Sequence, residues 1–142
     1  MNEISSFNRI MAIDYGTKRI GLALTDPLMT FAYPFKTIFN DSNLWTELTK
    51  IVQDQNISKI ILGYPLKENG KPATITEEVL KFKKKLEKLF KLEVILIDER
   101  YTSSIAQEII NKTVTKKSKR KDKGLLDKGS AAIILQDYLN ER

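Results

Sequence analysis

Short apolar runs alternate with stretches of helical periodicity along this chain, and this order limits its fold more than any other feature. Runs of strand length and composition lie at 9–14, 20–25, 35–39, 58–64 and 94–97. Apolar residues recur with helical spacing at 41–52, 74–89, 105–110 and 125–139. This order favours an α/β fold with a mixed central sheet flanked by helices, in which the central strands are parallel. It disfavours a helical bundle and a β-sandwich.

Turn and capping signals mark several boundaries between these elements. The polar turn between the first two strands is short enough to join them as an antiparallel hairpin. Asp41 or Ser42 is the candidate cap of the first helix. The segment 67–71 is expected to be a loop, and Thr74 with Glu77 forms a capping box ahead of the second helix.

The length of 142 residues suits a single domain spanning residues 1–142. The chain is 42% hydrophobic and 30% charged, as in ordinary globular proteins, and no apolar run approaches the roughly 18 residues of a membrane span. The first residues lack the basic and apolar regions of a secretory signal. We therefore expect a cytoplasmic protein that does not associate with membranes.

The sequence has no cysteine and no histidine. Disulfides, thiolate or imidazole zinc sites, Ser-His-Asp triads and cysteine nucleophiles are therefore excluded. Any chemistry must use carboxylates, Lys, Arg, hydroxyl groups or a metal ion. The net charge of +6 favours a polyanionic partner, although a lysine-rich solvated surface explains the same composition.

Two predicted strands end on acids. Asp14 closes the first strand in phase with Ala12, at an end of the sheet where open α/β sheets place their ligands. Glu99 follows the last strand in phase with Ile97, whereas Asp98 should point to the opposite face, so only one of these acids can share a site with Asp14. We choose Glu99 for its phase and longer reach, with Asp98 as the alternative. Taken singly, Asp14 is more simply explained as a turn-forming acid. The triplet Asp98-Glu99-Arg100, taken by itself, is more simply explained as a surface charge cluster.

A third acid, Asp127, heads a stripe on the last predicted helix. Ala131, Ile134 and Tyr138 follow it at spacings that place all four residues on one helix face. A carboxylate aligned with a core-facing stripe requires a metal ion or a hydrogen-bond donor nearby. The alternative is an acid that interacts favourably with the helix dipole near the N-terminus, and the sequence favours neither interpretation.

Together, these three carboxylates suggest a metal site. Carboxylates brought close repel each other unless a cation neutralises them, and hard oxygen ligands suit Mg²⁺ or Mn²⁺. A hydrolytic site of this kind needs no histidine, because one metal ion activates water and a second can stabilise the leaving oxygen. This chemistry agrees with a chain that contains no histidine.

Basic residues adjoin each of the three acids. Lys18 and Arg19 follow Asp14, and Arg100 follows Glu99. A basic run precedes Asp127 and contains Lys116, Lys117, Lys119, Arg120 and Lys121. These side chains could hold nucleic acid phosphates, although each is singly more typical of an exposed charge, and the run is also typical of a solvated loop.

The motifs that contain the acids resemble a known family. They are AIDYGTKRIGLA at 12–23, GYPL at 63–66, DERYTS at 98–103 and DKGSAAIILQ at 127–136. In this order they resemble the bacterial Holliday-junction-resolvase-like family, which is also described as the nuclease that matures the 5′ end of pre-16S ribosomal RNA. The resemblance implies a ribonuclease H-like fold, a metal site made of Asp14, Glu99 and Asp127, and a cytoplasmic role in ribosome maturation.

The resulting hypothesis is an Mg²⁺- or Mn²⁺-dependent endonuclease acting on structured RNA, with pre-16S rRNA as the substrate. A resolvase of branched DNA would use the same acids. A non-catalytic RNA-binding module would keep the basic residues and use the acids to hold a structural cation. The segment 14–21 also looks like the phosphate-binding hairpin of actin-like ATPases and sugar kinases, but those proteins pair two related domains and this chain has room for one.

Overall fold

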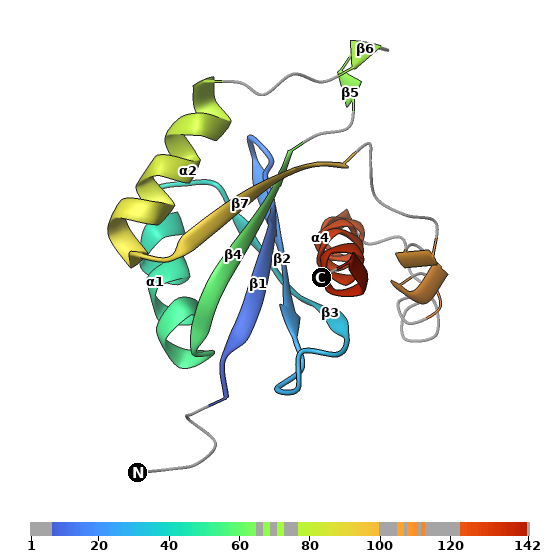
Figure 1. Ribbon diagram of the computed structural model, residues 1–142. Helices are drawn as coiled ribbons and strands as arrows, with labels where there is room; N and C mark the ends of the chain where they lie inside the picture. The colour runs from blue at the N-terminus through green and yellow to red at the C-terminus, as the bar shows by residue number, and fades with distance from the viewer. Residues whose placement is uncertain are drawn as a thin grey trace.

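The computed structural model describes residues 7–64, 67–68, 71–72, 77–99, 105–106, 108–110, 112 and 123–141, with the backbone alone described at 67–68, 71–72 and 123–128. A five-stranded sheet in the order β3-β2-β1-β4-β7 forms its centre (Figure 1). The strands are β1 (Arg9–Asp14), β2 (Arg19–Thr25), β3 (Ala32–Phe39), β4 (Ile57–Tyr64) and β7 (Glu93–Asp98). β1 and β2 form an antiparallel hairpin, β2 and β3 are antiparallel, and β4 lies parallel to β1 and β7. The predicted mixed sheet with parallel central strands is confirmed.

Helices cover both faces of the sheet. α1 (Leu44–Asp54) and α2 (Glu77–Phe90) lie on one face, and α4 (Lys123–Glu141) lies on the other (Figure 1). The helix predicted for 105–110 is confirmed at its described positions, which are helical. None of the described helices combines the length and apolar character that crossing a bilayer requires.

Alternation along the strands divides the core into two layers. In β1, Met11 and Ile13 belong to the layer beneath α1 and α2, whereas Ile10 and Ala12 belong to the layer beneath α4. All four side chains are buried, as the apolar run predicts for a strand covered on both faces. The first layer also contains Leu22, Leu24, Ile60, Leu62, Leu48, Phe82 and Leu86, and the second contains Ala23, Ile61, Ala131, Ile134 and Leu135.

The start of α1 differs from its prediction. Asn43 is the cap residue, and its side chain makes no capping hydrogen bond, so the prediction of Asp41 or Ser42 was wrong. The Asp41 carboxylate instead accepts a hydrogen bond from the Asn43 amide at 2.9 Å, and the Asp41 carbonyl accepts one from the Leu44 amide at 3.1 Å. These bonds form a tight turn ahead of the helix, and the helix therefore begins later than the side-chain pattern predicts.

Two further boundaries were predicted incompletely. The segment 67–71, expected to be a loop, contains β5 (Lys67–Glu68) and β6 (Lys71–Pro72), which pair as a small antiparallel hairpin. β3 begins at Ala32 and is longer than the apolar run at 35–39, because pairing with β2 extends to the Thr25–Ala32 pair. The capping box of Thr74 and Glu77 lies outside the described residues, since Thr74 does.

Candidate active site

Asp14 lies at the carboxyl edge of the three parallel strands. It ends β1 and is in register with Gly63 of β4, which in turn is in register with Ile97 of β7. Because side chains alternate along a strand, Asp14 follows Ala12 on the α4 face of the sheet. The side chain is partly buried there. The fold therefore places this acid where parallel sheets expose their ligand-binding edge.

Glu99 reaches the same place from β7. It comes directly after the strand, in phase with Ile97, which belongs to the core layer beneath α4. A side-chain hydrogen bond joins Glu99 to Asp14, and the Oε2 atom of Glu99 is buried. Asp98 is in register with Tyr64 and contributes only its charge to Glu99. The structure thus brings together the two acids that strand alternation selects.

Gly63 makes this approach possible. A Cβ atom built at position 63 would collide with the Cδ1 atom of Ile134 on α4 and would lie 3.5 Å from the Cγ atom of Glu99. The Ile134 side chain is buried and fills the space that glycine leaves. The glycine therefore lets α4 and the Glu99 side chain pack over the end of β4 at the same time.

The protonation of Glu99 reflects its crowded surroundings. Burial, then the hydrogen bond with Asp14 and the negative charges of Asp14 and Asp98, raise the pKa of Glu99 from 4.5 to about 10. Without a bound cation, Glu99 therefore keeps its proton at neutral pH. A divalent cation would replace that proton, because it neutralises both carboxylates. These two oxygen donors fit Mg²⁺ or Mn²⁺, which prefer carboxylate ligands.

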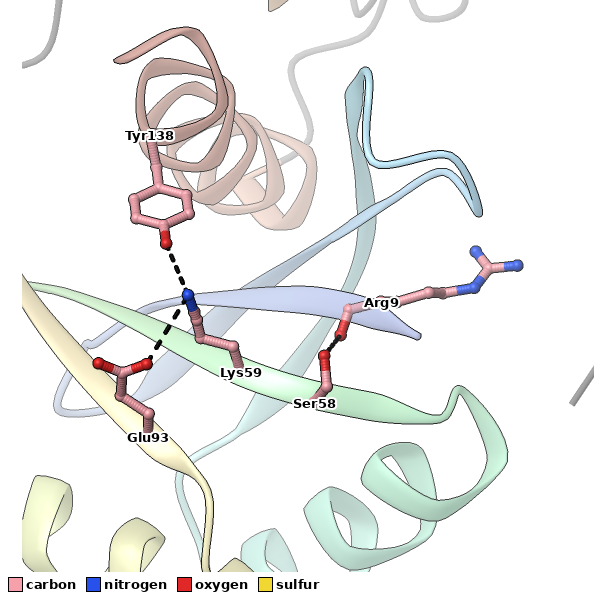
Figure 2. Close-up of polar contacts among 5 residues, drawn as sticks. All are labelled: Arg9, Ser58, Lys59, Glu93 and Tyr138. Carbon is pink, nitrogen blue, oxygen red and sulfur yellow. Dashed lines mark hydrogen bonds and ion pairs between the residues drawn. The ribbon is translucent and has the colours of Figure 1, made fainter. Parts of the chain in front are cut away.

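Two side-chain contacts join the second half of α4 to β4. Near its end, the Tyr138 hydroxyl accepts a hydrogen bond from the Lys59 ammonium group at 2.9 Å, and Lys59 also lies 3.7 Å from Glu93 (Figure 2). Ile134, one turn earlier in α4, packs at Gly63, further along β4. Ile134 and Tyr138, one turn apart in α4, thus contact β4 near its carboxyl end and near its start, respectively.

Asp127 lies in the N-terminal part of α4. Its position shares a helix face with Ala131 and Ile134, both of which are buried against the sheet. The Asp127 side chain is outside the described part of the structure. Among the side chains that are described, no cluster of three acids stands ready to hold a metal ion. The third ligand therefore remains a prediction.

The turn after Asp14 is held in place by contacts that the sequence did not reveal. The Asn40 side chain donates a hydrogen bond to the Gly16 carbonyl at 2.9 Å. The Tyr15 hydroxyl donates one to Glu78 of α2 at 2.9 Å, and the Tyr15 ring packs on Phe82 at 4.9 Å between centroids. A Cβ atom at Gly16 would collide with the Arg19 carbonyl, which explains the glycine in this turn. Burial and the bond to Glu78 raise the pKa of Tyr15.

The structure describes only two of the predicted phosphate-binding residues. Lys18 is exposed at the tip of the β1–β2 hairpin, and Arg19 is half-buried at the start of β2. Both lie on the hairpin that begins at Asp14. The remaining predicted contacts lie outside the described residues: Arg100, Lys116, Lys117, Lys119, Arg120 and Lys121.

Solved structures share this architecture. RuvC of T. thermophilus, determined in complex with a Holliday junction substrate, matches with a TM-score of 0.60 at 10% identity, over 93% of this chain and 94% of that one. The fowlpox virus Holliday junction resolvase matches with a TM-score of 0.56 at 17% identity, over 94% of this chain and 99% of that one. At these identities the likeness concerns the fold, which is ribonuclease H-like.

Sequence comparison identifies much nearer relatives. A protein of Salinibacter ruber named "Putative pre-16S rRNA nuclease" is 39% identical over 142 residues, covering 99% of this chain and 98% of its own. A protein of Endomicrobium trichonymphae with the same name is 42% identical over 135 residues, covering 94% of this chain and 96% of its own. The model of the RuvX family, described as Holliday junction resolvase, matches residues 8–141. The chain therefore belongs to the RuvX family.

Proposed function

We propose that this protein is a metal-dependent endonuclease that hydrolyses phosphodiester bonds in structured nucleic acid, and that its substrate is the precursor of 16S rRNA. The observation that carries the proposal is the hydrogen-bonded pair of Asp14 and Glu99 at the carboxyl edge of the parallel strands. The names of the near relatives support the choice of RNA. A cytoplasmic location follows from this role.

The residues of the site have separate tasks in this proposal. Asp14 and Glu99, with Asp127 as the third ligand, hold Mg²⁺ or Mn²⁺. When bound, the metal supplies Lewis-acid chemistry, which activates water and stabilises the leaving oxygen. Glu99 gives up its proton when the metal binds, so metal affinity rises with pH. Lys18 and Arg19 hold phosphate groups beside the hairpin that carries Asp14.

The test compares cleavage by wild-type protein and by the variants Asp14→Asn and Glu99→Gln. Each purified protein is incubated with precursor 16S rRNA and Mg²⁺ or Mn²⁺, and cleavage is followed on sequencing gels. We expect cutting at a defined position by the wild type, and loss of at least about 100-fold in rate for either variant. Circular dichroism verifies that the variants are folded. Equal cutting by a folded Asp14→Asn variant would falsify the mechanism.

A second candidate substrate is branched DNA, because the family is described as Holliday junction resolvase. The same acids would act on it, so the acid variants do not separate the two. Four-way DNA is therefore offered with precursor RNA in one competition assay. Preferred resolution of the junction assigns the site to DNA. Binding of RNA without metal-dependent cutting of either substrate would instead favour a non-catalytic RNA-binding module.

A further inference from the structure

The outward face of α2 carries a row of lysines that the site described above does not use. The residues Val79, Phe82 and Leu86 face the core. Exposed lysines recur on the opposite side of the helix at spacings of three and four residues, and one more follows the helix end. We call them the α2 lysine stripe: Lys81, Lys84, Lys85, Lys88 and Lys91.

The stripe lysines differ from their neighbour Lys83 in their charge partners. Lys83, on a different side of α2, pairs with Glu87 at 2.8 Å. In the part of the chain that the structure describes, no acidic side chain forms an ion pair with a lysine of the stripe. Like charges three and four residues apart repel along a helix, which costs stability unless an anion lies between them. A polyanion would remove this cost.

The stripe also has a defined shape. Lys84, Lys85, Lys88 and Leu89 line a shallow groove of about 510 Å³. The Lys85 ammonium group lies 4.6 Å from the centre of the Trp45 ring, which holds that side chain over α1. The aliphatic stems of the lysines form the walls, so their charges lie at the rim. Rim charges above a shallow groove suit an extended anionic chain better than a compact ligand.

One end of α2 is attached to the catalytic edge. Glu78, in the first turn of α2, accepts the hydrogen bond from Tyr15, the residue after Asp14. Lys81 lies one turn further on, and α2 then leads away from that edge (Figure 1). At 1.5 Å per residue, Lys91 lies about 20 Å from Glu78 along the helix axis. A duplex carries about one charge per 1.7 Å, so several phosphates span this distance.

We propose that the α2 lysine stripe is a second nucleic acid contact surface, which binds the phosphate backbone of a duplex arm beside the point of cleavage. This inference rests on the proposed function and adds to it. The stripe holds long substrates and does not touch the scissile bond. It therefore sets the affinity and the KM, whereas the acids of the site set kcat.

The test uses two double variants with the same loss of charge. Lys84→Gln with Lys88→Gln removes two lysines of the stripe, and Lys36→Gln with Lys50→Gln removes two exposed lysines of β3 and α1. Binding of full-length protein to a labelled precursor RNA duplex is measured by fluorescence anisotropy with EDTA, at several salt concentrations. We expect the stripe variant to bind about tenfold more weakly and to lose about 1.5 from the slope of log K against log salt.

Cleavage kinetics provide a second readout. We expect the stripe variant to raise KM and to keep the wild-type kcat, and the Lys36/Lys50 control to change neither. A second pair, Lys81→Gln with Lys91→Gln, should reproduce the result. Because anisotropy requires no cutting, a wild type that binds RNA but does not cleave it refutes the nuclease proposal and leaves the stripe test intact.

Three outcomes would overturn the inference. Equal weakening by the stripe variant and the control variant would mean that net charge alone matters. Unchanged binding in both would mean that the stripe does not meet the duplex. A stripe variant that loses binding to phosphatidylglycerol vesicles but keeps its RNA affinity would assign the surface to anionic lipid.

Discussion

Replacing Glu99 with glutamine tests the physical account of the site without any nucleic acid. The pKa of Glu99 in the folded, metal-free protein is about 10, against 4.5 without its neighbours. Below pH 4.5 the acid is protonated in both folded and unfolded chains and costs nothing. As the pH rises above 4.5, the unfolded chain releases the proton and the folded protein keeps it, so the folded state loses stability until the pH reaches the folded pKa.

The size of this effect follows from the linkage between protons and folding. One proton of difference lowers stability by about 1.36 kcal/mol per pH unit, or about 4 kcal/mol between pH 4.5 and 7.5. Because Glu99 is coupled to Asp14, this value is an upper limit. Glutamine has the same shape as a protonated glutamate and never ionises. Metal-free Glu99→Gln should therefore be more stable than the wild type near pH 7.5, by at most about 4 kcal/mol, and equally stable near pH 4.5.

Urea denaturation in EDTA, repeated between about pH 4.5 and 9, measures how the free energy of unfolding of the wild type and of the variant depends on pH. Glu108→Gln is the matched control, because that glutamate is exposed. Adding Mn²⁺ at pH 7.5 should reverse the order, since the wild type gains stability from metal binding and the variant loses a ligand. A variant that is less stable than the wild type at pH 7.5 in EDTA, or a difference that does not change with pH, would refute the reasoning.

Three further substitutions test the frame around the acids. Gly63→Ala adds a Cβ atom that collides with α4, and should lower the free energy of unfolding by about 2 kcal/mol and weaken Mn²⁺ binding in calorimetry. Asn40→Ala removes the hydrogen bond to the Gly16 carbonyl, and should cost about 1 kcal/mol in urea denaturation and speed amide exchange in the turn after β1. Tyr138→Phe removes the acceptor of the Lys59 ammonium group, and should cost about 1 kcal/mol by the same measurement, with the rate of cleavage unchanged.

The sequence predicts those parts of the fold that depend on interactions between residues close together in the chain. The apolar run before Asp14 and the short turn after it predict a hairpin, because period and turn length are properties of neighbouring residues. Alternation also predicts that Glu99 meets Asp14, and a side-chain hydrogen bond joins them in the structure. The start of α1 was mispredicted, because Asp41 competes for backbone amides in a turn instead of capping the helix.

The contacts that frame the site could not be predicted in this way. Tyr15 and Glu78 are 63 residues apart in sequence, and Asn40 lies 24 residues from Gly16. No periodicity joins such pairs, since they meet only once the sheet has placed β3 and α2 beside the β1–β2 hairpin. The lysine spacing of α2 is visible in the sequence. That its charges meet no described acid is visible only in the folded chain.

Metal binding and duplex binding use different parts of the molecule, and this separation has a consequence for how they depend on each other. The acids lie on the α4 face of the sheet edge, whereas the α2 lysine stripe lies on the opposite layer. Among the described contacts, the hydrogen bond from Tyr15 to Glu78 and the packing of the Tyr15 ring on Phe82 join α2 to the residue next to Asp14. Each of these two contacts contributes about 1 kcal/mol. Only the part of that energy that changes when metal binds can couple the two sites, so we expect coupling of only a few-fold. Long substrates should therefore bind almost equally well with and without metal, and the metal should act on the rate of cleavage.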